Sequence, residues 1–132
     1  MAKRRASGTF EVQLVPQTPS DAAEGGVGRL TLAKTFRGDL EGESRGEMLA
    51  MSTTVAGSAG YVALERFRGT LGGRRGSFAL QHNGTMDRGS PTLSVTVVPD
   101  SGSDELTGIA GTMGIVIDGG GHSYDFEYTL GD

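Results

Sequence analysis

Hydrophobic and polar residues alternate along most of the chain with a period of two, which is the pattern of amphipathic β-strands. In residues 7–15, Phe10, Val12 and Leu14 share one face and polar residues occupy the other. The same alternation recurs along the sequence and predicts eight strands, over residues 7–15, 28–37, 40–51, 60–70, 76–86, 92–98, 105–117 and 122–130. Between the first two strands, residues 16–26 are polar and contain two prolines, which indicates an exposed loop.

Turn-forming residues separate these strands and define the fold class. Residues 60–70 and 76–86 are joined through Gly72 and Gly73, which predicts a hairpin. Helical composition is limited to residues 21–25 and 47–51, and both segments are too short to stand alone. Eight amphipathic strands fit a closed antiparallel barrel or a sandwich, and the glycines favour the barrel because coiled strands need bends. We therefore expect an all-β protein, a closed eight-stranded antiparallel β-barrel with almost no helix.

Length, charge and composition limit the remaining classes. The chain has 132 residues, which fits one barrel domain over residues 6–132 after a flexible basic N-terminus, residues 1–5. There are 23 glycines without a period of three, so a collagen helix is excluded. The absence of cysteine excludes disulfides and thiolate zinc sites.

The charge distribution and the hydrophobic runs suggest what the protein does not bind. The net charge is −4, and the two short basic clusters, residues 3–5 and 74–75, have no interleaved aromatic residues, so no nucleic-acid partner is expected. No apolar run has the length of a signal peptide or a membrane span. We therefore expect a cytoplasmic protein with no membrane partner.

Four blocks of sequence resemble an uncharacterised bacterial family, the domain-of-unknown-function family 3224. They are FRGDLEG at 36–42, GYVALE at 60–65, GSFALQHNGTM at 76–86 and VPDSGSDELTGIAG at 98–111. The resemblance extends from Ala6 to Leu130 in the same order. It implies the allene oxide cyclase-like barrel, an eight-stranded fold shared with plant dirigent proteins. It implies no reaction, and no motif aligns the cyclase's catalytic residues with positions in this chain.

Glu65 and His82 are the candidate catalytic residues. His82 shares a strand face with Phe78 and Leu80, and Glu65 shares a face of the paired strand with Phe67. If both faces point into the barrel, the two side chains are close enough to act as a general base and its orienting partner. The alternatives are a structural pair inside a core, or a histidine that bonds only a backbone carbonyl. A one-residue slip in register would place Gln81 in the cavity instead.

Other inward positions are candidates for ligand contact. Tyr124 and Tyr128 lie on the apolar face of the last strand, where their hydroxyl groups orient a ligand oxygen or only reach water while the rings pack. The full set of predicted ligand-binding residues is Tyr61, Met48, Gln81, Tyr124 and Tyr128.

The remaining motifs have simpler interpretations. The acidic ladder Glu41, Glu43 and Glu47 fits a solvated strand face better than a cation site, so no metal and no cofactor are expected. Residues 42–46 match the Gly-x-Ser-x-Gly hydrolase pattern by chance, because no strand-to-helix turn is predicted there. His122 is expected in an exposed turn.

Three functions remain open, and whether the protein is an enzyme is undecided. The first is a barrel that binds a small apolar molecule in its lumen, since the inward faces carry several small residues. The second is a cyclase- or isomerase-type enzyme that uses Glu65 and His82. The third is a structural homo-oligomer with a filled barrel, which would associate through outward residues such as Val62, Leu64 and Ala79. A pocket, and the groups inside it, would distinguish the three.

Overall fold

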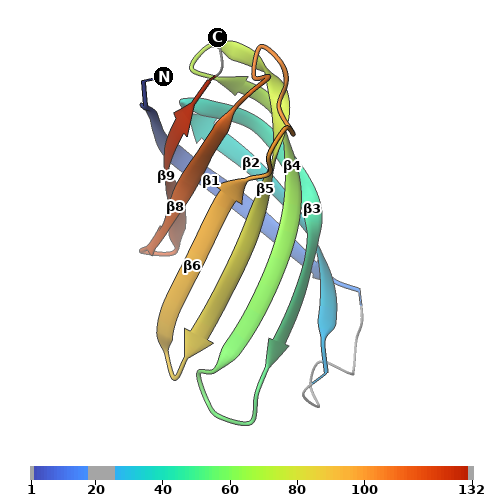
Figure 1. Cartoon of the computed structure of the whole chain (residues 1–132). Coiled ribbons are helices and arrows are strands. Elements are labelled where there is room, and N and C mark those ends of the chain that lie inside the picture. Colours follow the sequence, from blue (N-terminus) through green and yellow to red (C-terminus); the bar gives the residue numbers. More distant parts are fainter. Residues whose placement is uncertain (1, 18–25, 131–132) are drawn as a thin grey trace.

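The computed structural model describes residues 2–17 and 26–130, and within them it contains β-strands and no helix (Figure 1). The strands are β1 (Arg4–Pro16), β2 (Gly28–Gly38), β3 (Leu40–Ser52), β4 (Ala59–Leu71), β5 (Arg74–Asp87), β6 (Ser90–Val97), β7 (Ser103–Asp104), β8 (Ala110–Asp118) and β9 (Gly121–Thr129). All pairings are antiparallel, in the order β4-β3-β2-β1-β9-β8-β6-β5, and β4 pairs with β5 to close the ring. The two-residue strand β7 pairs with β5 outside this ring. The predicted closed eight-stranded barrel is confirmed.

Three local predictions need correction. Residues 105–109 were expected in a strand but lie outside the strands, with 105–108 in a turn, and β7 lies inside the stretch that was expected to be only a turn. Arg4 and Arg5 were expected in a flexible tail but belong to β1, where they pair with β9 and Arg5 bonds Asp125 at 2.8 Å. Backbone pairing and this ion pair are what order them. The predicted loop over 16–26, with the helical segment 21–25, falls largely on residues 18–25, outside the described part of the chain.

The turns follow from local sequence. Gly72 and Gly73 connect β4 to β5 with φ angles of 57° and 85°, a left-handed conformation that glycine adopts without steric cost. At Gly42, near the start of β3, a side chain would overlap the carbonyl oxygen of Arg68 on β4, so the close approach of β3 and β4 there requires glycine.

One end of the barrel is packed solid. Aromatic rings fill it from several strands: Phe67 lies 5.2 Å from Phe78, and Phe78 lies 5.7 Å from Phe126, centroid to centroid. The connection between β6 and β8 folds over this end and inserts Leu106 and Ile109, which are almost fully buried. This half therefore supplies most of the hydrophobic core, which holds the barrel closed.

The ring is joined unevenly around its circumference. Most neighbouring strands share long ladders, such as the thirteen paired positions between β4 and β5. The junction between β6 and β8 has a single paired position, Thr96 with Thr112. Figure 1 shows these two strands diverging away from that point. The barrel is therefore weakly joined along one side.

Candidate functional site

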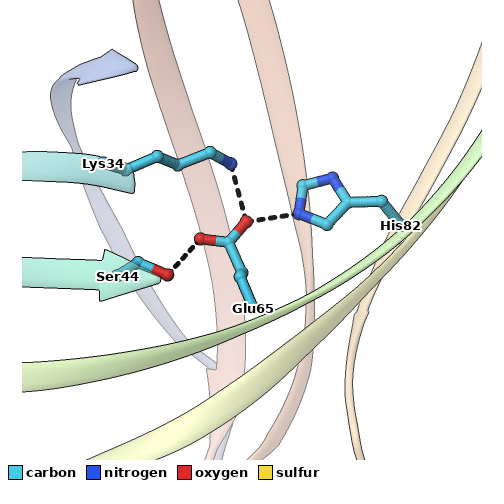
Figure 2. A network of polar contacts seen from close by, with 4 residues as sticks. All are labelled: Lys34, Ser44, Glu65 and His82. Carbon is cyan, nitrogen blue, oxygen red and sulfur yellow. Dashed lines mark hydrogen bonds and ion pairs between the residues drawn. The ribbon is translucent and has the colours of Figure 1, made fainter. Parts of the chain in front are cut away.

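A buried polar cluster of four residues, Lys34, Ser44, Glu65 and His82, lies inside the barrel (Figure 2). The four come from the adjacent strands β2, β3, β4 and β5, one from each. In each strand the residue occupies an inward position of the period-two alternation, so its side chain points into the barrel. We call these four residues the Glu65 cluster.

The Glu65 carboxylate is the centre of this cluster. Lys34 Nζ donates to Glu65 Oε1 at 2.7 Å, and His82 Nε2 lies 2.5 Å from the same oxygen. Ser44 Oγ donates to Glu65 Oε2. The carboxylate is 0% exposed, and the side chains of Lys34 and His82 are 6% and 4% exposed. Three donors therefore converge on one buried anion.

The surroundings of Glu65 hold its pKa at about 2, below its ordinary value of 4.5. Burial is the largest single influence and raises the pKa. The hydrogen bond from His82, the charge and hydrogen bond of Lys34, and the hydrogen bond from Ser44 together outweigh burial and lower the pKa. Glu65 is therefore ionised at neutral pH and accepts hydrogen bonds without donating any.

Lys34 is a cation in an aromatic environment. Its Nζ lies 4.9 Å from the ring centroid of Phe10 and 5.8 Å from that of Phe36. Ring faces attract a cation electrostatically, which adds to the ion pair with Glu65. The ammonium group therefore sits at the boundary between the aromatic core and the space above it.

Above the Glu65 cluster the barrel is hollow. A cavity of about 840 Å³ opens at the end opposite the packed half. Lys34 and His82 contribute polar groups to its lining, and most of the other walls are apolar. These apolar wall residues include Phe10, Val12, Leu14, Leu30, Leu32, Met48, Ala50, Ala63, Met86, Leu93, Ile115 and Ile117. The Glu65 cluster thus forms a polar floor beneath an apolar space.

The structure brings several of the predicted site residues together. Glu65 and His82 are in contact, as described, although the residue directly opposite His82 in the ladder is Ala63. Met48 and Tyr61 line the cavity, and the Tyr61 ring lies 6.4 Å from the His82 ring. Burial, followed by the charge of Glu65, raises the pKa of Tyr61.

Three other predicted ligand contacts lie away from this cavity. Gln81 is exposed on the outer face, because its neighbour His82 points inward. Tyr124 and Tyr128 point inward but are buried in the packed half. The Tyr124 hydroxyl group accepts from the Leu40 amide at 2.9 Å and lies 3.0 Å from the Arg37 carbonyl oxygen, so it serves the backbone.

Sequence reasoning missed two residues of the site and misplaced a third. Lys34 lies between Leu32 and Phe36 on the inward face of β2. Its spacing of two residues from each of them could have identified it as an inward residue. Ser44 entered the sequence analysis only as part of the chance hydrolase pattern at residues 42–46, and it lies within β3, so the pattern has no strand-to-helix turn. His122 was expected in an exposed turn, but it is half-buried and lines the cavity, with its ring 5.1 Å from that of Phe10.

No metal centre is evident in the residues that the structure describes. They contain no group of three or more histidine, aspartate or glutamate side chains placed to hold an ion. Glu41, Glu43 and Glu47 are exposed on the outer face of β3, as expected for a solvated ladder. The same part of the chain contains no helix that could span a membrane.

Together, the fold and the site define a class: a half-filled antiparallel barrel with a buried lysine–glutamate–histidine cluster beneath an open apolar cavity. The family model described as protein of unknown function DUF3224 matches residues 6–128. This chain belongs to that family.

A solved structure supports the same assignment. The chain is similar to a crystallised protein of unknown function from the DUF3224 family of Shewanella oneidensis MR-1, with 48% sequence identity and a TM-score of 0.92. The match covers 99% of each chain. No curated protein matches the chain. The resemblance identified from sequence is therefore confirmed for the family and the barrel.

Proposed function

We propose that this protein binds a small, largely apolar molecule in the open half of its barrel. The observation that carries the proposal is the cavity of about 840 Å³ with apolar walls. Its volume lies within the range of pockets that enclose small organic ligands, roughly 300–1,000 Å³. Mostly apolar walls with a few convergent polar groups are also typical of such pockets.

The contrast between the two halves of the barrel supports this proposal over a purely structural role. The packed half shows that these strands enclose a solid core where the inward residues are large, such as Phe67 and Phe78. In the hollow half, smaller residues such as Ala50 and Ala63 occupy inward positions, and the space between the walls is left open. Filling it with side chains would bury more apolar surface and add stability. An open apolar cavity is therefore better explained by a ligand than by a structural role.

A matched pair of tryptophan substitutions tests the proposal. Ala50→Trp places a large ring inside the cavity, whereas Leu49→Trp places the same ring on the outer face, where Leu49 is 46% exposed. The fluorescent apolar dye N-phenyl-1-naphthylamine reports occupancy. We expect wild type and Leu49→Trp to bind the dye and Ala50→Trp to lose at least tenfold in affinity. Equal dye binding by all three proteins, or none by the wild type, would refute the proposal.

Catalysis in the same cavity is a second candidate, and the contact between Glu65 and His82 is the observation that favours it. An ionised carboxylate that orients a histidine is the arrangement used in general-base catalysis. In this arrangement Glu65 is the orienting partner and His82 is the group that would accept a proton. The discriminating experiment begins with native mass spectrometry of the purified protein, which would identify a bound molecule. Turnover of that molecule by wild type and its absence in His82→Gln would support an isomerase-type enzyme.

A further inference from the structure

One nitrogen of His82 is without a protein partner and is accessible from the cavity. Nε2 is engaged with Glu65 Oε1, and no other hydrogen bond of the ring occurs among the described residues. Within that part of the chain no buried side-chain nitrogen or oxygen lacks a partner, so Nδ1 is not a sealed, unsatisfied atom. His82 lines the cavity, and Figure 2 shows its second ring nitrogen pointing away from Glu65.

The contact with Glu65 decides which nitrogen carries the hydrogen. The carboxylate is ionised and can only accept, so Nε2 must carry the hydrogen of that bond. In the neutral imidazole ring the other nitrogen is then an acceptor with a free lone pair. With the ring in its neutral form, the cavity floor presents Nδ1 of His82 as a hydrogen-bond acceptor.

Lys34 provides the complementary donor. Its ammonium group has three N–H donors, and its described hydrogen bond, to Glu65, uses one of them. Lys34 and His82 both line the cavity, and Lys34 Nζ and His82 Nε2 both contact the same carboxylate oxygen, Oε1 of Glu65. The cavity floor therefore carries a donor on Lys34 and an acceptor on the neighbouring side chain of His82.

From this geometry we infer that the ligand carries a hydroxyl group, which donates to His82 Nδ1 and accepts from Lys34. A hydroxyl group can donate one hydrogen bond and accept another, so it can bind His82 Nδ1 and the Lys34 ammonium group at the same time. The inference rests on the proposed binding function and names the ligand class: an apolar alcohol rather than a ketone or a carboxylate.

Charge and polarity argue against the other head groups. A ketone oxygen can accept a hydrogen bond from Lys34, but it has no hydrogen to donate to Nδ1. Once the ligand has displaced water from the cavity, Nδ1 is then a buried acceptor without a partner, which is unfavourable. A carboxylate adds a second negative charge near Glu65. The positive side chain of Lys34 already balances Glu65. The residues beside His82 are Ala63 and Tyr61 on β4 and the apolar Val95 on β6, and His122 on β9 lines the same cavity. A bound carboxylate would therefore meet the like charge of Glu65 at the cavity floor, where Lys34 is already paired.

Three ten-carbon probes test the inference by displacement of N-phenyl-1-naphthylamine: 2-decanol, 2-decanone and decanoate. In the wild type we expect 2-decanol to bind at least tenfold more tightly than either competitor, the effect of leaving one buried acceptor unpaired. His82→Phe keeps a planar ring but has no hydrogen-bond acceptor, and Lys34 and Ser44 still bind Glu65, so the ratio should fall to within about twofold. Gln81→Ala, on the outer face, is the matched control and should retain the full preference.

The outcomes separate this inference from the function beneath it. Equal binding of all three probes by the wild type would overturn the alcohol preference and leave the binding function standing. Tightest binding of decanoate would overturn it in favour of an anion site. Failure of the wild type to bind the dye or any probe would refute both the alcohol preference and the proposed binding function. Nitrogen NMR of histidine-labelled wild type gives a check that needs no variant, because a protonated Nδ1 with an unprotonated Nε2 would contradict the assigned tautomer.

Discussion

Replacing Lys34 with methionine isolates the energetics of the Glu65 cluster. The change removes the charge and the hydrogen bond at 2.7 Å but keeps an unbranched apolar side chain beside Phe10 and Phe36. Glu65 then remains fully buried with two donors and no opposite charge. Removing one partner of a buried ion pair costs about 3–5 kcal/mol, because the remaining charge is uncompensated. We expect Lys34→Met to lower the free energy of unfolding by about 3 kcal/mol at pH 7.

Urea unfolding followed by far-ultraviolet circular dichroism measures this loss. With a slope of about 2 kcal/mol per molar urea, it appears as a fall of about 1.5 M in the midpoint. Arg37→Met is the control, because Arg37 lies on the outer face of the same strand in an exposed pair with Glu11 at 3.2 Å. Exposed pairs contribute less than about 1 kcal/mol. If Lys34→Met and Arg37→Met differ by less than about 1 kcal/mol, the assignment of Lys34 as the balancing charge is wrong.

The pH dependence of the free energy of unfolding provides an independent test of the same reasoning. The folded protein holds the pKa of Glu65 at about 2, against 4.5 ordinarily. At 1.36 kcal/mol per unit, this contributes on the order of 3 kcal/mol of stability. Because the folded pKa is the lower one, that stability is present above about pH 4.5 and is lost as the pH falls toward 2. Without Lys34 the folded pKa rises, so the gap between wild type and Lys34→Met should narrow over this range. Parallel pH profiles would refute the reasoning.

Three further predictions concern the scaffold. Tyr124→Phe leaves the Leu40 amide without its acceptor, and we expect a loss of about 1–3 kcal/mol by thermal unfolding while dye binding stays unchanged. Gly42→Ala should cost about 1–3 kcal/mol in urea unfolding because the new methyl group overlaps backbone of β4, whereas Gly114→Ala, whose methyl group has space, should change stability by less than about 1 kcal/mol. Leu106→Ala should cost about 2–5 kcal/mol by the same measurement, since this fully buried side chain closes the packed end. An effect below about 0.5 kcal/mol for any of the three destabilising changes would contradict the packing described above.

The alternation of the sequence grouped the residues of each strand by face, but it left open, as for Gln81 and His82, which face points inward. Glu65 and His82 were expected inside on neighbouring strands, and they are, because successive side chains of a strand point to opposite sides. The contact between Glu65 and His82 depends on the register of the two strands as well as on the face that each side chain occupies. Ala63 is the direct partner of His82, and Glu65 reaches the histidine diagonally across the ladder. The register that permits this contact is fixed by the turn at Gly72 and Gly73.

The period-two alternation of the sequence could not predict how far along the barrel axis an inward residue lies. Tyr61 and Tyr124 are both inward aromatic residues, yet Tyr61 lines the cavity and Tyr124 is buried in the packed half. A period of two defines the face but not the height, which depends on the stagger of the strands around the whole ring. Lys34 was overlooked for a different reason: a charged residue is seldom fully buried unless it is paired, and the sequence does not display the pairing.

The single paired position between β6 and β8 makes the barrel resemble a ring with one weak joint. A hoop held by long ladders on every side resists widening, because any expansion stretches many hydrogen bonds at once. Here the β8–β9 hairpin is held to β1 by a long ladder but to β6 only by the bridge between Thr96 and Thr112. The packed end clamps the ring at its other end. The molecule thus combines a packed base with a rim that is weakly fastened along one seam, so separating the strands there would break fewer backbone hydrogen bonds than at any of the long ladders.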